Sequence, residues 1–312
     1  MSDSVKPIMT SAPHIHSDNS TRRIMLDVIL ALAPAAIASV VLFGTKALLI
    51  ILTCVIAAVA SEAIFNVIFG RKQSVGDLSA ALTGLLLALN LSTNVALWQC
   101  AVGAVVAIVV VKCLFGGLGH NFANPAITGR VFLLMAFSSV AGGALPKGVD
   151  AVSSATPLEQ LTADGIADGI PSLLQMLLGQ RGGAIGEGCI IALLIGFAYL
   201  VARKVIHWEV PVIFIGTVFV CFLIASGDIV FSLYEILAGG LFLGAIFMAT
   251  DYVTTPITRK GRMLFALGCG LLTFIIRRFC AYPEGVSFSI LAMNLLSPYL
   301  EKITANKPLG GG

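Results

Sequence analysis

The sequence predicts an all-α integral membrane protein of about ten transmembrane helices, arranged as two inverted five-helix repeats. Of its 312 residues, 58% are hydrophobic and 11% are charged. Soluble domains have about 45–50% apolar and about 25% charged residues. Apolar stretches of nearly 20 residues recur along the chain, long enough to cross a hydrocarbon core of about 30 Å. The third observation is a weak internal repeat with an offset of 158 residues.

The apolar stretches define ten spans and five regions. We expect spans near residues 24–42, 47–69, 77–92, 95–115, 125–141, 186–202, 210–226, 231–249, 262–276 and 284–300. The regions are an N-terminal tail (1–23), a first five-helix repeat (24–141), a loop (142–185), a second five-helix repeat (186–300) and a C-terminal tail (301–312). The first tail is polar and has no apolar signal-peptide core, so the first span is expected to act as its own anchor.

The distribution of basic residues predicts the orientation. Ten spans that start in the cytoplasm place fourteen of the nineteen lysines and arginines on the cytoplasmic side. The other five are Lys46, Lys147, Arg181, Arg277 and Arg278. The positive-inside rule therefore predicts cytoplasmic termini and an extracytoplasmic loop over 142–185. The surrounding partner is membrane lipid, and no basic tract indicates nucleic acid.

The spacing of polar residues and prolines supports the internal repeat. The offset aligns Asp77 with Glu235, Ser92 with Thr250, Thr93 with Asp251, Ala123 with Ala281, and Pro125 with Pro283. Five spans per half is an odd number, so the second half must enter the membrane in the opposite direction. Functional sites of such folds lie between the repeats, where helices are interrupted.

Four charged residues in or beside the spans are candidate site residues. Glu62 lies inside the second span and either bonds a neighbouring helix or serves an ion pathway. Asp251 closes the eighth span and either binds a cation or caps a helix. Arg277 and Arg278 form an adjacent pair at an outward helix end, where they either snorkel to headgroups or bind an anion. No catalytic residue, metal site or iron–sulfur cysteine cluster is expected.

By composition alone, the outer-loop stretch from Asp150 to Leu158 is an ordinary loop. Together with other stretches, however, it resembles the flavin-carrying membrane subunits of the NqrB/RnfD family, over almost the whole chain. The matching stretches are 111–117, 121–126 with 129–130, 154–158, 247–251, and 282–286 with 293–294.

The resemblance implies two flavins. In the family, a threonine in an aspartate, Ser or Thr, Gly, Ala, Thr pattern carries FMN through a phosphoester bond. Thr156 is the matching residue, and Asp150, Ser153 and Ser154 complete the pattern, with Ser154 at the position that is most often glycine. Members also hold riboflavin non-covalently, for which Tyr282 and the helix starts at Pro125 and Pro283 are candidates.

The outward arginine pair suggests a hypothesis about the FMN. A phosphodiester keeps one negative charge, and guanidinium groups match phosphate geometry. Arg277 or Arg278 is therefore a candidate contact of the FMN phosphate or ring.

The resemblance also implies a function. Such a chain is a subunit of an Rnf-type ferredoxin:NAD oxidoreductase in a prokaryotic plasma (inner) membrane, coupling electron transfer to Na⁺ or H⁺ translocation. Its partners would be the A, B, C, E and G type subunits and a flavin transferase, and it would not turn over alone.

Two alternatives remain open. An NqrB-type subunit of a sodium-pumping NADH:quinone reductase is less favoured, because the first span already starts near residue 24. A non-redox transporter or channel is possible because the five-plus-five architecture resembles that of urea channels.

Overall fold

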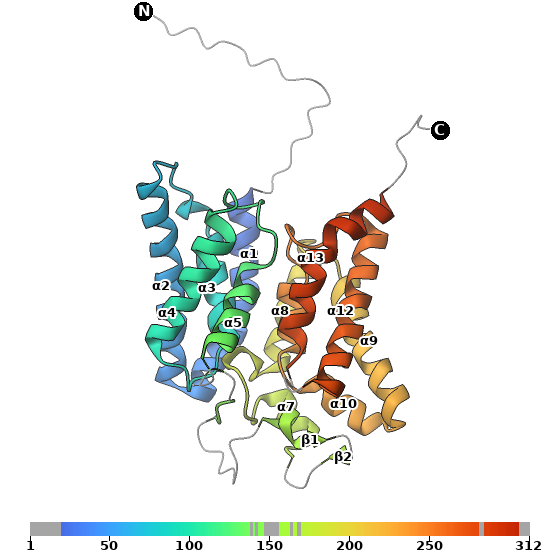
Figure 1. The fold of residues 1–312 in the computed structure, drawn as a ribbon. Helices are drawn as coiled ribbons and strands as arrows, with labels where there is room; N and C mark the ends of the chain where they lie inside the picture. Colours follow the sequence, from blue (N-terminus) through green and yellow to red (C-terminus); the bar gives the residue numbers. More distant parts are fainter. Residues whose placement is uncertain are drawn as a thin grey trace, which may run out of the picture.

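The computed structural model describes residues 20–137, 140, 143–146, 156–162, 165–166, 170–280 and 284–305. These residues form a bundle of helices with one small hairpin (Figure 1). The first half contains α1 (Thr21–Phe43), α2 (Thr45–Ile68), η1 (Val75–Asp77), α3 (Ser79–Leu89), α4 (Leu97–Val105), its π-helical continuation η2 (Val106–Cys113), and α5 (Pro125–Ala136).

The connecting region holds short elements. These are α6 (Pro157–Gln160), the antiparallel strands β1 (Leu161–Thr162) and β2 (Gly165–Ile166), α7 (Leu173–Leu178) and the 3₁₀ turn η4 (Ile185–Glu187). The second half contains α8 (Ile190–Ala202), α9 (Glu209–Ser226), α10 (Ile229–Leu237), α11 (Leu241–Leu243), η5 (Gly244–Met248), α12 (Arg259–Phe279) and α13 (Val286–Thr304).

Helix boundaries follow local sequence signals. Ser20 caps α1 by accepting from the backbone N–H of Arg23, and Gly44 ends it with a φ of 78° that favours glycine. The side chain of Asn124 caps α5, and Pro125 occupies the first helical position, where its missing N–H costs nothing. The starts and ends of these helices are therefore encoded locally.

An all-helical membrane architecture is confirmed, and the number of spans is less regular than expected. Within the described residues, α1, α2 and α9 are long and apolar enough to cross a bilayer. The predicted eighth span is broken, because α10 and the α11–η5 helix are bent by 65°. Four further apolar helices have 10–17 residues: α3, α4 with η2, α5 and α8.

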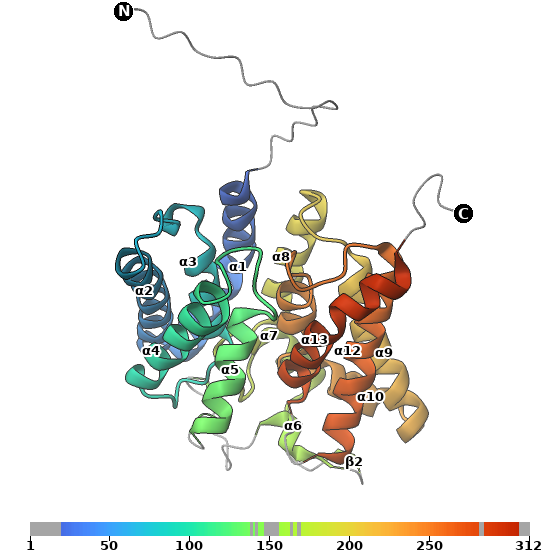
Figure 2. The same ribbon diagram turned by 45° about the horizontal axis from the view of Figure 1, so that its top comes forward.

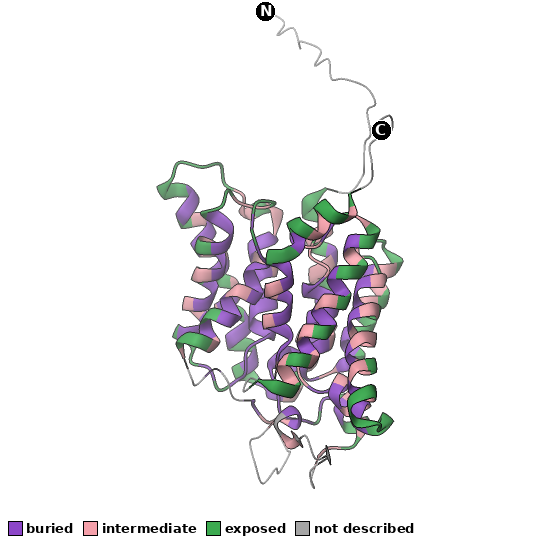
Figure 3. Cartoon of the chain, turned by 45° about the vertical axis from the view of Figure 1, so that its right-hand side comes forward, coloured by how far each residue is buried: buried purple, intermediate pink, exposed green. Residues whose placement is uncertain are grey.

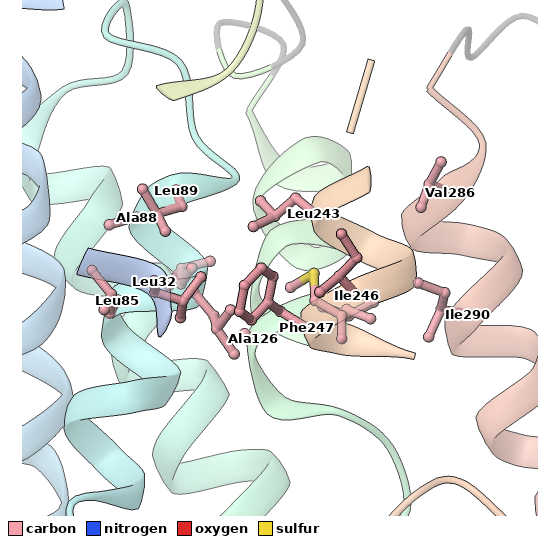
Figure 4. Close-up of a cluster of buried hydrophobic side chains, with 14 of the residues drawn as sticks. Leu32, Leu85, Ala88, Leu89, Ala126, Leu243, Ile246, Phe247, Val286 and Ile290 are labelled. Atoms are coloured by element: carbon pink, nitrogen blue, oxygen red, sulfur yellow. The ribbon is translucent and has the colours of Figure 1, made fainter. Parts of the chain in front are cut away.

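The two halves lie side by side and contribute to one core. Helices α1–α5 pack on one side and α8–α13 on the other (Figure 2). Five residues of the first half meet five of the second in the buried cluster of Figure 4: Leu32, Leu85, Ala88, Leu89 and Ala126, and Leu243, Ile246, Phe247, Val286 and Ile290. Phe247 lies between the two sets.

The outside of the bundle is apolar as well. Exposed residues lie along the outer helix faces (Figure 3), and many are large and hydrophobic, such as Val41 at 73% and Ile224 at 80% exposure. A contiguous surface of this kind is unfavourable in water and is matched by lipid chains.

One contact crosses the boundary between the halves at equivalent positions. The Asn90 amide donates to the sulfur of Met248 over 3.3 Å, and these residues are 158 apart. Residues on a two-fold axis meet their own equivalents, so this contact supports the offset found in the sequence.

The first described helix begins, and the last one ends, at the same end of the bundle. The start of α1 and the end of α13 lie at the top of Figure 1, whereas α6, α7 and the hairpin lie at the bottom. The described segments thus agree with termini on one side and the loop on the other. The assignment of these sides to cytoplasm and exterior stays a prediction.

We predict that Gly84 allows α2 and α3 to approach closely. A Cβ on Gly84 would lie 2.7 Å from the carbonyl oxygen of Cys54, whereas a Cβ on the helical control Gly216 would meet nothing within 4 Å. Gly84→Ala should destabilise the protein by about 1–3 kcal/mol. Gly216→Ala should be neutral or stabilising, because alanine is the better helix former. Thermal unfolding in detergent measures both, and equal melting temperatures would contradict the prediction.

Candidate flavin and ion sites

Thr156 precedes α6 and is half-buried. Its methyl group occupies space left by Gly143, since a Cβ on Gly143 would collide with Cγ2 of Thr156. Gly143 is held by the Asn94 amide, which donates to its carbonyl over 2.9 Å, and Ala144 forms a bridge with Gly183. The threonine therefore sits against fixed backbone. Asp150, Ser153 and Ser154 lie outside the described residues.

Leu158 anchors the segment that follows Thr156. It is buried at 6% exposure in a small cluster whose other members are Met176, Ile190, Leu237 and Ala238. The backbone N–H of Gln160 donates to the carbonyl of Thr156 over 3.2 Å and closes the single turn of α6. Thr156 is thereby attached to the end of α10.

The two outward arginines differ in environment. The side chain of Arg277 is 1% exposed. Its Nη1 donates to the carbonyl and the carboxylate of Glu235 over 2.5 and 3.3 Å, and its Nη2 donates to the carbonyl of Ala238 over 3.1 Å. Arg278 is exposed, and Tyr282 lies outside the described residues. Arg277 thus faces the end of α10 rather than a headgroup layer.

Arg181 is a buried site residue that the sequence did not reveal. It is 2% exposed and donates to the carbonyls of Leu237 and Glu187. Burial lowers the pKa of Arg181 to about 10, so it stays charged at neutral pH. Its neighbours in the sequence are Gln180 and two glycines, which are typical of an exposed loop.

A further ion pair joins the two halves. Arg130 of α5 pairs with Glu284, which precedes α13. Arg130 is one of the fourteen basic residues counted on the cytoplasmic side, but it is 4% exposed within α5 and is not a free surface charge. Lys112, Arg181 and Arg277 are buried too. Without these four residues, twelve basic residues lie on the predicted cytoplasmic side and three on the other side, which still favours the predicted orientation.

Glu62 is the centre of a buried polar network in the first half. It is 1% exposed, and its Oε1 accepts from Nζ of Lys112 over 2.8 Å and from Oγ of Ser74 over 2.5 Å. Lys112 also donates to Oγ of Ser79 over 2.6 Å, and Ser79 in turn bonds Asp77. Sequence analysis missed the pair because its members are 50 residues apart.

Asp251 has a different environment. Its Oδ2 accepts from Oγ1 of Thr254 over 3.1 Å. Among the described residues, the ion pairs include none with Asp251. Its carboxylate is therefore stabilised by a hydroxyl and not by a basic side chain.

A cavity between the halves brings several of these groups together. Its polar lining residues are Ser79, Thr83, Lys112, Asn121, Asn124, Thr250, Asp251 and Tyr252. It measures about 70 Å³, and a second cavity of about 160 Å³ shares Ile206 and the segment 250–252 as a wall. Oδ1 of Asn121 is buried and has no hydrogen-bond partner among the described residues. The cavity therefore joins the Lys112 network to Asp251.

We predict that Lys112 is required to keep Glu62 stable in the interior. Lys112→Met should cost about 3–5 kcal/mol, because it leaves a buried carboxylate without its partner. The double variant Glu62→Gln/Lys112→Met should recover most of that loss, since both charges are gone. Thermal unfolding of the detergent-solubilised protein tests this, with exposed Lys260→Met as the control. A double variant as unstable as the single one would contradict it.

Comparisons with known proteins agree with this architecture. The sequence model of the NQR2, RnfD, RnfE family matches residues 8–310. The chain is 43% identical over 305 residues to the D subunit of the Na(+)-translocating ferredoxin:NAD(+) oxidoreductase complex of Acetobacterium woodii, covering 97% of this chain and 95% of the relative. It is also 43% identical over 314 residues to the proton-translocating counterpart of Clostridium ljungdahlii, covering 95% and 94%.

More distant relatives match over the same extent. The chain is 33% identical over 346 residues to the D subunit of the ion-translocating oxidoreductase complex of Escherichia coli O7:K1, covering 97% of this chain and 98% of that protein. Both the family model and these identities extend over nearly the whole length. The chain therefore belongs to the NQR2, RnfD, RnfE family.

Proposed function

We propose that this chain is the D-type membrane subunit of an Rnf ion-translocating ferredoxin:NAD oxidoreductase complex. The observation that carries the proposal is the 43% identity, over at least 94% of both chains, to two proteins of that type. It would work with the A, B, C, E and G type subunits in a prokaryotic plasma membrane, with Thr156 on the extracytoplasmic side.

Thr156 is the proposed attachment point of FMN, placed there by a flavin transferase. The bound flavin would accept and donate electrons, while the protein fixes its position. Two features support the fit. Thr156 is half-buried at the surface of the bundle, and Gly143 leaves room for its methyl group. Leu158 and the Ala144–Gly183 bridge hold the chain on either side.

Thr156→Val should abolish covalent flavin, because valine keeps the shape of threonine but lacks the hydroxyl oxygen. The measurement is flavin fluorescence of the denatured chain in a gel, with mass spectrometry of the peptide that contains Thr156. Thr156→Ser serves as the control that retains a hydroxyl. A wild-type chain from native membranes without the label would refute FMN attachment and favour the non-redox transporter.

The cavity between the halves is the proposed place of riboflavin. The pyrimidine edge of a flavin carries an N–H donor between two carbonyls, and this N–H suits the unpartnered Oδ1 of Asn121. Ligand pockets usually measure about 300–1,000 Å³, so the side chains between the two cavities must move apart. Asn121→Leu should remove extractable riboflavin and retain covalent FMN, and liquid chromatography of denatured extracts would show an unchanged content if the site is elsewhere.

Asp251 is the stronger of the two ion-pathway candidates. The charge of Glu62 is already balanced by Lys112 at 2.8 Å. Asp251 instead has the hydroxyls of Thr250, Thr254 and Thr255 in its own segment and lines both cavities. Carboxylate, hydroxyl and carbonyl oxygens are the ligands that a hard cation such as Na⁺ requires, and a carboxylate can equally carry a proton.

Asp251→Asn should therefore lower ion translocation per electron on the order of tenfold, as expected for loss of one charged ligand. Glu62→Gln/Lys112→Met should keep the coupling, since it removes a balanced pair. Both are measured in proteoliposomes containing the complex, as ion uptake relative to ferredoxin oxidation. If Asp251→Asn kept normal coupling and the double variant lost it, Glu62 would be the ion-pathway residue instead of Asp251.

A further inference from the structure

The carboxyl end of α10 is held by two buried arginines from different parts of the chain. A helix leaves its last carbonyls without intrahelical partners, and α10 ends at Leu237 where the chain bends by 65°. Arg181 donates to the carbonyl of Leu237. Arg277, from the last turn of α12, donates to the carbonyls of Glu235 and Ala238. Three carbonyls at one helix end are thus satisfied by charged donors.

These donors are well placed to fix the bend. Hydrogen bonds to charged groups are stronger than those between neutral groups, and water is scarce at sites this deeply buried. Glu235 accepts from Arg277 over 3.3 Å and balances its charge. The side chains of Arg277 and Glu235 are 1% and 6% exposed. Loss of either arginine would leave carbonyls of the bend unpaired, so the bend depends on both.

The same helix end packs against the segment that carries Thr156, and this packing site is called the seat below. Leu158 packs against Leu237 and Ala238 in the small buried cluster. Gly239, just beyond the end of α10, has a φ of 66°. A Cβ at Gly239 would be 3.3 Å from Cδ2 of Leu158 and 3.1 Å from Nη2 of Arg277. The guanidinium group and the leucine side chain therefore both lie next to the position that a Cβ of Gly239 would occupy, and a side chain there would push against both.

The geometry points to Arg181 and Arg277 as positioning residues for Thr156. They hold the end of α10, the end of α10 holds Leu158, and Leu158 fixes α6 two residues after the threonine. This inference rests on the proposed function, because the group to be positioned is the flavin on Thr156. According to this inference, Arg277 acts through the backbone of residues 235–238 and does not contact the FMN phosphate.

The test uses the assembled complex in detergent with four single variants: Arg277→Gln, Arg181→Gln, Leu158→Ala and the exposed control Arg278→Gln. Hydrogen exchange of the peptide spanning 156–162 reports on the seat, and the fluorescence anisotropy of the covalent flavin reports on the position of the cofactor. The first three variants should accelerate exchange about tenfold, as expected for loss of one charged hydrogen bond or an equivalent apolar contact. They should also lower the anisotropy, and Arg278→Gln should change neither.

Leu158→Ala keeps the inference testable if an arginine variant fails to assemble, because it leaves both guanidinium groups and Glu235 in place. Arg277→Lys keeps the charge and one donor, so it should restore part of the anisotropy.

Unchanged hydrogen exchange in both Arg277→Gln and Leu158→Ala would show that the end of α10 does not hold the segment 156–162. Faster exchange with unchanged anisotropy overturns the positioning role. A shift of the flavin midpoint potential in Arg277→Gln, with none in Leu158→Ala, would assign Arg277 as a direct contact and overturn the inference as well. A wild-type chain without flavin contradicts the proposed function instead, and the exchange data still decide the seat.

Discussion

Polar groups inside this bundle must find partners within the protein, because the surrounding hydrocarbon offers none. Most backbone groups meet this requirement inside a helix. The requirement becomes demanding where helices begin or end in the interior, at the start of α3 and at the bend after α10. Buried side chains complete the hydrogen bonding at both places, which explains why the charged residues of a very apolar chain are gathered near helix ends.

The two halves meet the requirement in similar ways at opposite ends of the bundle. In the first half, Lys112 reaches Ser79 at the start of α3, and Ser79 bonds Asp77. In the second, Arg277 reaches Glu235, the residue that the 158-residue offset aligns with Asp77. In each half a basic side chain from a later helix is thus linked to one of these two aligned acidic residues, through the Ser79 hydroxyl in the first half and directly in the second. The chemistry differs, since a lysine offers a point charge and an arginine a planar fork that can bind two carbonyls.

Sequence reasoning succeeded where the determining signals are local. The expected span 24–42 became Thr21–Phe43 because Ser20 and Gly44 mark both ends of that helix. The predicted family is confirmed, since its motifs are continuous stretches of sequence. The eighth span was expected to be continuous, although Gly239 and Gly240 in its middle are a recognisable break. The Glu62–Lys112 pair and the burial of Arg181 depend on contacts between distant segments, and hydropathy does not encode which polar groups will meet.

The contact between Asn90 and Met248 has a consequence for how the two halves can differ. In an exact two-fold repeat, a residue on the axis would face an identical copy of itself, and the contact would have no direction. Here both halves belong to one polypeptide, so the two positions hold different side chains, and an amide donates to a thioether. The axis is thus the place where near-symmetry is broken at the level of a single hydrogen bond. Asn124 adds to the imbalance, because its amide donates to the backbone carbonyl of Met248. The predicted repeat is therefore asymmetric at this contact, and the asymmetry distinguishes one half from the other.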